Sequence, residues 1–170
     1  MATTTAAVAG TAGGPAAESS PRRVLLVGSS GGHLAQMLAL EPWWRDRERH
    51  WVTFDTADAR SRLADEAVTW AHSPTTRNVP NLARNLRLAA SVVRDFRPDV
   101  VVSTGAGVAL PFFVVARATG VRTVYVEVYD RIDSATLTAR LCAPFTDLQL
   151  VQWEEQRRLF PAATVIGPLL

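Results

Sequence analysis

The chain has 170 residues and a formal net charge of +2. This length predicts one domain, large enough to fold around a hydrophobic core without a disulfide or a structural metal. The charge excess is too small to indicate nucleic-acid binding, and no apolar run approaches the ~18 residues of a membrane-spanning helix. The only cysteine, Cys142, lies in an apolar helical stretch and is expected to be a buried thiol in a reduced, cytoplasmic protein.

Residues 1–20 are rich in alanine, threonine and glycine and lack the basic and apolar segments of a secretory signal. We expect a disordered tail there and a single domain over residues 21–170. Any membrane contact of such a chain is expected to be peripheral.

Apolar runs and amphipathic segments alternate along the chain. In chain order, they predict a strand at 23–28, a helix at 33–40 that stops near Pro42, a strand at 50–54, a helix at 56–66, a strand at 67–71, a helix at 79–96, a strand at 99–103, a helix at 108–119, a strand at 122–126, a helix at 134–142, a strand at 147–151, a short helix at 154–159 and a strand at 164–166. Strands that are apolar throughout and alternate with helices indicate a Rossmann-like, doubly wound parallel sheet, an α/β fold. Ligands of such sheets bind beyond the carboxyl ends of the strands, so the loops after the first, fourth and fifth predicted strands are the places to seek a site.

The first of these loops reads Gly28-Ser-Ser-Gly-Gly-His33. Glycines that lead into a helix N-terminus favour a phosphate or diphosphate, although they also suit a tight turn without a ligand. The dinucleotide and P-loop patterns both fail here. The hydrolase pattern G-x-S-x-G matches around Ser30, but no histidine occurs after His72 to serve as its usual late base. His33 is a candidate general base or phosphate ligand, or else a capping residue.

The fourth loop, Ser103-Thr-Gly-Ala-Gly107, again places glycines between a strand and a helix. The fifth strand ends at Glu127, and Arg131 follows shortly after. A carboxylate at the edge of a buried sheet is either functional or paired, so Glu127 is a candidate base or sugar ligand, and Arg131 its partner or a phosphate ligand.

The predicted helix at 79–96 carries three arginines, Arg84, Arg87 and Arg94, on one face. We expect the opposite face, formed by Val79, Leu82, Leu86, Ala89 and Val93, to pack on the sheet. The basic face either contacts anionic lipid headgroups or is simply solvated.

Several stretches together, in this order, resemble one known family, the acceptor-side subunits of split GT-B glycosyltransferases. They are Gly28-Ser-Ser-Gly-Gly-His33, the segment from Ser103 to Phe112, Tyr125-Val-Glu-Val-Tyr-Asp-Arg131 with Leu137-Thr-Ala-Arg-Leu141, the segment from Asp147 to Trp153, and Ile166-Gly-Pro168. That family includes bacterial PssD- and CpsF-type polysaccharide proteins and the eukaryotic Alg14 subunit, and it is similar to the first domain of MurG. Residues 128–130 differ from the Ser-Phe/Tyr-Ala/Cys type that often follows the glutamate in this family.

The resemblance implies the N-terminal half of a GT-B enzyme in polysaccharide or lipid-linked oligosaccharide biosynthesis. Such a subunit docks on the cytoplasmic leaflet of the membrane and holds a polyprenyl-diphosphate-linked acceptor, while a separate small subunit holds the UDP-sugar; no metal and no other cofactor is implied. By resemblance, the acceptor diphosphate binds at Gly31, Gly32, Gly105, Gly107 and Arg131, and the catalytic residues are His33 and Glu127. The expected reaction is a direct displacement at C1 of the donor sugar, with His33 or Glu127 as the base. Two alternatives remain open: a non-catalytic scaffold that recruits a catalytic partner to the membrane, and a stand-alone phosphate- or nucleotide-binding enzyme.

Overall fold

The computed structural model describes residues 21–130 and 133–170. The predicted tail at 1–20 and the candidate phosphate ligand Arg131 lie outside the described residues. Every predicted strand is present within a few residues of its expected bounds. The strands are β1 (Arg23–Val27), β2 (Glu48–Phe54), β3 (Val68–Ala71), β4 (Val100–Ser103), β5 (Arg122–Val126), β6 (Leu148–Val151) and β7 (Thr164–Val165).

The helices also follow the prediction, with two short additions in the described residues. One starts at Glu41 with Pro42 in its first turn, and the other is a 3-10 helix at Ala143–Phe145. The α-helices are α1 (Gly32–Ala39), α2 (Glu41–Trp44), α3 (Ala57–Arg62), α4 (Val79–Phe96), α5 (Ala109–Thr119) and α6 (Leu137–Cys142). Two 3-10 helices, η1 (Ala143–Phe145) and η2 (Glu154–Arg158), flank β6. Within the described ranges, no helix is both long and apolar enough to cross a bilayer.

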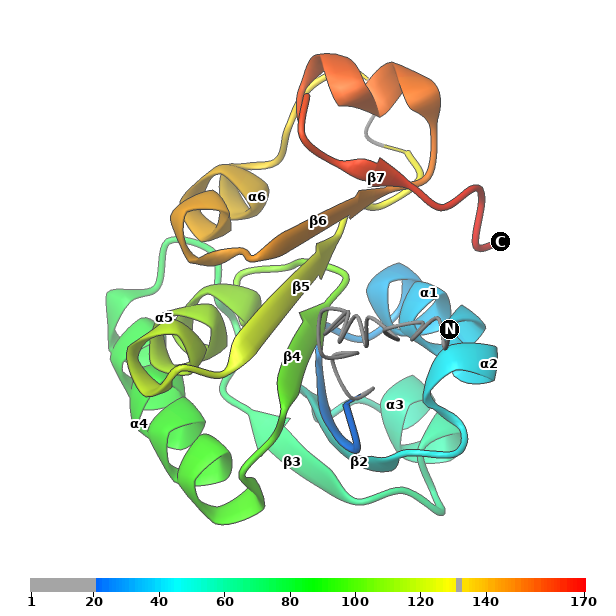
Figure 1. Ribbon diagram of the computed structural model, residues 1–170. Coiled ribbons are helices and arrows are strands. Elements are labelled where there is room, and N and C mark those ends of the chain that lie inside the picture. Colours follow the sequence, from blue (N-terminus) through cyan, green and yellow to red (C-terminus); the bar gives the residue numbers. More distant parts are fainter. Residues whose placement is uncertain (1–20, 131–132) are drawn as a thin grey trace, which may run out of the picture.

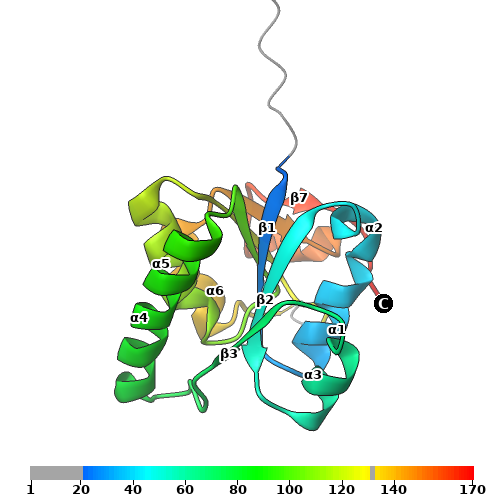
Figure 2. The same cartoon turned by 90° about the horizontal axis from the view of Figure 1, so that it is seen from below.

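The sheet has seven strands in the order β3-β2-β1-β4-β5-β6-β7, and every neighbouring pair is parallel. Helices α4, α5 and α6 cover one face, and α1, α2 and α3 lie on the other (Figures 1 and 2). Two apolar cores follow from this layering. Leu25, Val101 and Phe112 belong to the core under α4 and α5, whereas Leu26, Met37 and Trp51 belong to the core under α1. The doubly wound α/β prediction is therefore confirmed.

This topology fixes where the loops lie. Because all strands are parallel, the seven carboxyl ends share one edge of the sheet. The chain runs outward from β1 to β2 and β3 on one side and from β4 to β7 on the other, so the strand order reverses between β1 and β4. Sheets of this kind bind ligands in the crevice at that reversal.

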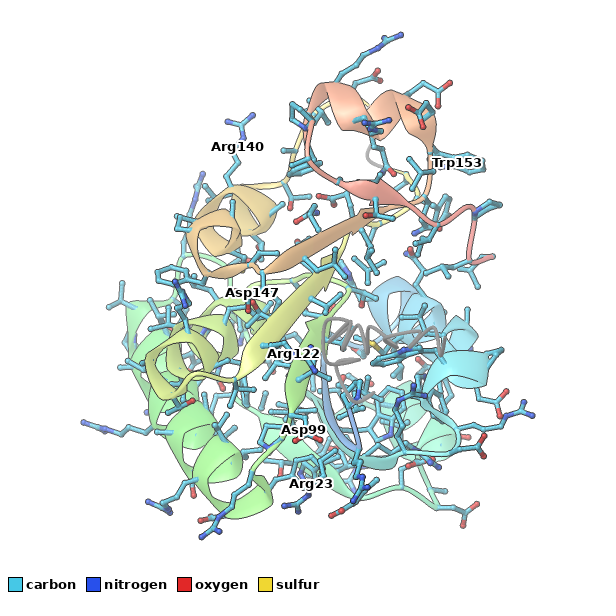
Figure 3. The ribbon with its side chains drawn as sticks, viewed as in Figure 1. Arg23, Asp99, Arg122, Arg140, Asp147 and Trp153 are labelled. Carbon is cyan, nitrogen blue, oxygen red and sulfur yellow. The ribbon has the colours of Figure 1, made fainter. Side chains whose placement is uncertain are left out.

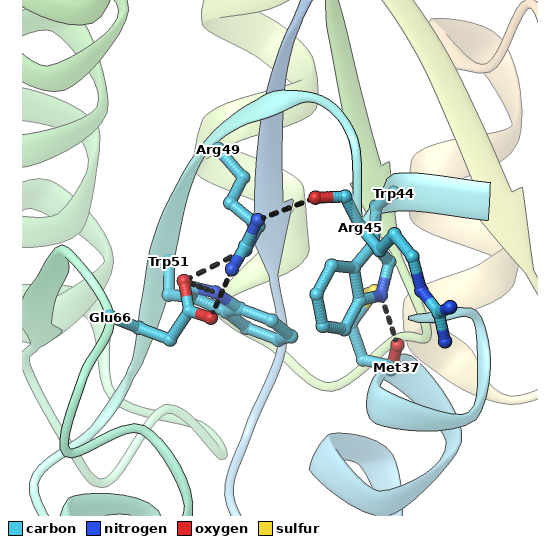
Figure 4. Close-up of polar contacts among 6 residues, drawn as sticks. All are labelled: Met37, Trp44, Arg45, Arg49, Trp51 and Glu66. Carbon is cyan, nitrogen blue, oxygen red and sulfur yellow. Dashed lines mark hydrogen bonds and ion pairs between the residues drawn. The ribbon is translucent and has the colours of Figure 1, made fainter. Parts of the chain in front are cut away.

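A tryptophan and arginine cluster ties α2 to β2 (Figure 4). Glu66 accepts two hydrogen bonds from Arg49, of 2.8 and 2.6 Å, and a third from the indole of Trp51 at 3.2 Å. The Arg49 guanidinium also lies 4.8 Å from the ring centre of Trp44, which contacts Trp51 edge to face. One carboxylate thus satisfies three donors at the rim of the second core.

Replacing Glu66 with alanine should lower the free energy of unfolding by about 1–3 kcal/mol, because a half-buried guanidinium and an indole N–H would lose their acceptor. Urea unfolding of the variant measures this. The control is Glu48→Ala, since Glu48 pairs with Arg23 at a more exposed position and such pairs contribute about 0–1 kcal/mol. Equal losses in the two variants would contradict a structural role for the cluster.

Candidate functional site

The loops after β1 and β4 are joined by a reciprocal pair of hydrogen bonds. The His33 ring donates from Nδ1 to the carbonyl oxygen of Thr104 at 2.7 Å, and the Thr104 hydroxyl donates to the carbonyl oxygen of His33 at 2.9 Å. Because a carbonyl oxygen only accepts, Nδ1 carries a proton and the Nε2 of the neutral ring keeps its lone pair. The contact lies at the reversal of strand order and leaves the half-buried His33 with a fixed tautomer.

Gly105 has a backbone conformation and a packing environment that both favour glycine. Its φ of +104° is rare for other residues, and an added Cβ would lie 2.8 Å from the Tyr125 hydroxyl and 3.3 Å from Cε1 of His33. Burial and the charge of Glu127 raise the pKa of Tyr125, so its hydroxyl stays protonated. Gly105 thus brings the fourth loop against the histidine ring.

Gly107 brings in another loop. A Cβ on this residue would lie 2.8 Å from the hydroxyl oxygen of Thr75, in the segment between β3 and α4. In contrast, nothing lies within 4 Å of the Cβ positions of Gly31 and Gly32, and Gly31 has φ +70°. Gly31 and Gly32 are therefore exposed, and a ligand can approach their backbone closely.

Two helices begin in these glycine loops, and neither has a side-chain cap among the described residues. Gly31 precedes α1, and Val108 precedes α5. Helices α3, α4 and α6 differ, because Thr56, Asn78 and Thr136 accept hydrogen bonds from their first turns. The first-turn N–H groups of α1 and α5 are thus not capped by a side chain at the predicted anion site, and the helix dipoles add partial positive charge there.

Glu127 follows β5 at the same edge and has only 1% of its surface exposed. Its amide donates to the carbonyl of Leu150 at 2.9 Å, and its carbonyl accepts from Nε2 of Gln152 at 3.0 Å. One carboxylate oxygen accepts from the amide of Val128 at 3.2 Å. Of the two candidate bases, His33 is thus the more accessible to a ligand, because Glu127 is buried at this edge of the sheet.

The fifth loop also contacts α1. The amide of Tyr129 donates to Oε1 of Gln36 at 3.3 Å, and Gln36 lies one turn along the helix from His33. The structure therefore places Gly31, Gly32, His33, Gly105, Gly107 and Glu127 at one edge of the sheet, and of these His33 and Gly105 are in direct contact. The sequence reasoning missed Thr104, Tyr125 and Gln36, whose roles depend on contacts between distant segments.

The orientation of α4 differs from the prediction. Val79, Leu82 and Leu86 were expected to face the sheet, but they are 72%, 41% and 41% exposed. Ala89 and Val93 are buried as predicted, and the rest of the buried face is formed by Asn81, Asn85 and Val92. The asparagines are buried because they bond to the backbone of the preceding segment: Asn85 to both the amide and the carbonyl of His72, and Asn81 to the carbonyl of Pro74.

The exposed surface of α4 therefore combines apolar and basic residues. Arg84, Arg87 and Arg94 are exposed as predicted, and Arg94 pairs with Asp95 at 3.0 Å. On a helix of 3.6 residues per turn, Val79, Leu82 and Leu86 form a stripe beside these arginines.

Cys142 is fully buried on α6, as predicted, and burial raises the pKa of its thiol to about 12. The thiolate is therefore scarce at neutral pH and the residue is unreactive.

Comparison with known sequences finds proteins of oligosaccharide synthesis. Residues 60–169 match the family model "Oligosaccharide biosynthesis protein Alg14 like", which is more than half of the chain. The chain is 24% identical to the UDP-N-acetylglucosamine transferase subunit ALG14 of Mus musculus, over 87% of this chain and 83% of that subunit. It is 23% identical to the Homo sapiens subunit of the same name, over 86% of this chain and 82% of that subunit.

Solved structures share the fold at lower identity. Acinetobacter baumannii MurG matches with a TM-score of 0.66 and 17% identity, over 79% of this chain and 43% of MurG. The UDP-GlcNAc 2-epimerase of Methanocaldococcus jannaschii matches with a TM-score of 0.67 and 14% identity, over 85% of this chain and 45% of the epimerase. The chain spans less than half the length of these two proteins.

Proposed function

Because the chain belongs to the family of Alg14-like oligosaccharide biosynthesis proteins, we propose that it is the acceptor-binding subunit of a two-chain UDP-sugar glycosyltransferase. Its substrate in this proposal is a polyprenyl-diphosphate-linked saccharide. The observation that carries the proposal is the junction of the loops after β1, β4 and β5 at one edge of the sheet, where His33 is bonded to Thr104 and Gln36 to Tyr129.

In this site the acceptor diphosphate lies against the glycine loops. Amides at Gly31, Gly32 and Gly107 offer donors. Gly105, whose own amide donates to the Ser103 hydroxyl at 3.0 Å, adds close backbone approach, and the starts of α1 and α5 add partial positive charge. Arg131 is a further proposed ligand. No metal or other resident cofactor takes part in this proposal, because backbone amides and helix N-termini stabilise the negative charge of the acceptor diphosphate.

His33 is the proposed general base. Its Nε2 lone pair removes the proton from the acceptor hydroxyl as that oxygen forms a bond to C1 of the donor sugar. The bond from C1 to the UDP oxygen breaks at the same time, and UDP leaves with the electron pair. Because the acceptor oxygen attacks from the face opposite UDP, the configuration at C1 is inverted. The Thr104 carbonyl then favours the protonated ring by accepting from Nδ1.

A partner chain supplies the donor side. The chain covers most of the mouse and human transferase subunits but only 43% of MurG, so the subunit length corresponds to about half of a MurG-like enzyme. We therefore assign the UDP-sugar to a separate small subunit, with transfer at the interface of the two chains.

Transfer of labelled N-acetylglucosamine from its UDP donor to a short polyprenyl-diphosphate saccharide tests this function. Activity should require both this chain and the donor-binding partner. Turnover by this chain alone would support a stand-alone enzyme instead. Full turnover by a pair in which His33 and Glu127 are both replaced would support the scaffold alternative.

The exposed stripe and arginines of α4 are the proposed contact with the inner face of the plasma membrane. An arginine near an anionic surface contributes about 1 kcal/mol, so Arg84→Gln with Arg87→Gln should weaken binding to phosphatidylglycerol-rich vesicles roughly 30-fold. Vesicle co-sedimentation measures this. The matched control replaces Arg60 and Arg62, which lie on α3 in the opposite helix layer (Figure 2). An equal loss in the control would mean that net charge, rather than α4, determines the binding.

A further inference from the structure

Three buried glutamines connect elements that are far apart in the sequence. They are Gln36 on α1, Gln152 just after β6 and Gln156 in η2. The side-chain Nε2 of Gln152 donates to Oε1 of Gln36 at 2.6 Å. The backbone N–H of Gln152 donates to Oε1 of Gln156 at 2.8 Å. Buried amides cost free energy unless they are well paired, and this network is paired across α1, β6 and η2.

The network fixes the backbone of the segment that follows β5. The carbonyl of Glu127 accepts from Gln152 at 3.0 Å, and the carbonyl of Val128 accepts from Gln156 at 2.9 Å. The amide of Tyr129 donates to Gln36 at 3.3 Å. Three successive residues are therefore held by side chains after regular strand pairing has ended, so this loop is preorganised.

The held segment carries an exposed aromatic side chain. Tyr129 is 47% exposed although its backbone is fixed. The indole of Trp153 donates to the carbonyl of Tyr129 at 2.9 Å, and Figure 3 shows Trp153 at the carboxyl end of β6. Gln36, which binds the Tyr129 amide, lies three residues after His33, about 4.5 Å along the axis of α1.

We propose that Tyr129 is a platform for the sugar ring of the acceptor, and that Gln36, Gln152 and Gln156 position it. This inference rests on the proposed function and adds to it a subsite for the saccharide, distinct from the glycine loops that take the diphosphate. The C–H groups on one face of a hexose pack against the electron-rich face of an aromatic ring. A ring on a fixed backbone loses little conformational entropy on binding, which favours affinity.

Isothermal titration with two probes tests the platform on the purified chain. One probe is farnesyl diphosphate, and the other is farnesyl diphosphate bearing one N-acetylglucosamine. We expect the chain to bind the sugar-bearing probe roughly 10-fold more tightly, a difference of about 1.4 kcal/mol. Tyr129→Ala should abolish that difference and leave the affinity for farnesyl diphosphate unchanged, whereas Tyr129→Phe should keep it.

The matched control is Leu141→Ala, which removes an apolar side chain on α6 that is 46% exposed and should change neither affinity. Gln36→Leu removes the oxygen that holds the Tyr129 amide and should reduce the sugar-dependent difference without changing farnesyl diphosphate binding. If Gln36→Leu keeps the full wild-type difference in affinity between the two probes, the positioning role of the network is refuted.

The outcomes separate the platform from the proposed function. If the wild-type chain binds both probes equally, or if Tyr129→Ala keeps the difference, the platform is wrong and the acceptor role stands. The platform is also wrong if Tyr129→Ala changes only the binding of the partner chain. If the wild-type chain binds neither probe, the acceptor role itself fails and the platform with it.

Discussion

Replacing His33 with alanine should lower the rate of sugar transfer by the reconstituted pair about 10²- to 10⁴-fold, the usual contribution of a positioned general base. The turnover number should fall while the KM for the acceptor changes little, because the glycine amides that hold the diphosphate remain. The fold should persist, since His33 is only half-buried and lies at the loop edge. Steady-state kinetics with the labelled donor measures this, and circular dichroism checks the fold.

His72 provides the control for this experiment. It is an exposed histidine that follows β3 at the same edge of the sheet, and its backbone, rather than its ring, is bonded to Asn85. His72→Ala should leave transfer close to the wild-type rate. Unchanged turnover in His33→Ala, or an equal loss in both variants, would remove His33 from the mechanism.

Gly105→Ala should both destabilise the chain and impair transfer. The new methyl group would sit 2.8 Å from the Tyr125 hydroxyl and 3.3 Å from the His33 ring, on a backbone with φ +104°. Backbone strain and overpacking each cost about 1–3 kcal/mol, so we expect a loss of about 2–6 kcal/mol in the free energy of unfolding. Displacement of His33 should also reduce the turnover number at temperatures where the variant is folded.

Gly120→Ala separates strain from crowding. Gly120 ends α5 with φ +74°, but nothing lies within 4 Å of its Cβ position, so this substitution should cost only about 1 kcal/mol and leave turnover unchanged. Chemical denaturation and kinetics of the two variants side by side provide the test. Similar stability and similar turnover in both would mean that the contact of Gly105 with His33 has no functional consequence.

Much of the fold could be predicted because its signals are local. Val24–Val27 and Val100–Val102 are apolar without alternation, which is typical of strands covered on both faces. The glycine-rich loops were expected at the ends of β1 and β4, and they lie there; Gly31 and Gly105 have positive φ angles, whereas Gly28, Gly32 and Gly107 do not. Once the strands were known to be parallel, the meeting of their loops followed from topology, because parallel strands end at one edge of the sheet.

The face of α4 that packs on the sheet could not be predicted in the same way. Val79, Leu82 and Leu86 have the spacing of a core stripe, and the periodicity of a helix does not show what the stripe packs against. Asn81 and Asn85 replace apolar residues on the buried face because the amide and carbonyl groups of a preceding loop need partners. That need arises only in the folded chain.

The glutamine network was missed for a related reason. Gln36 and Gln152 are 116 residues apart, and a single glutamine in a helix or after a strand is ordinary in sequence. Their importance comes from burial and mutual pairing, which no local pattern encodes. The same holds for Thr104, whose two bonds to His33 fix the tautomer of the candidate base.

The central claim is that this chain binds the diphosphate of the acceptor through its glycine loops and leaves the UDP-sugar to a partner. The most direct test is an NMR titration of the chain alone, labelled with ¹⁵N only at its 10 glycines. Farnesyl diphosphate should shift the amide signals of Gly31, Gly32, Gly105 and Gly107 and leave those of Gly120 and Gly167 in place, while UDP-N-acetylglucosamine should shift none. Shifts caused by the nucleotide sugar, or lipid-induced shifts confined to Gly120 and Gly167, would contradict the account.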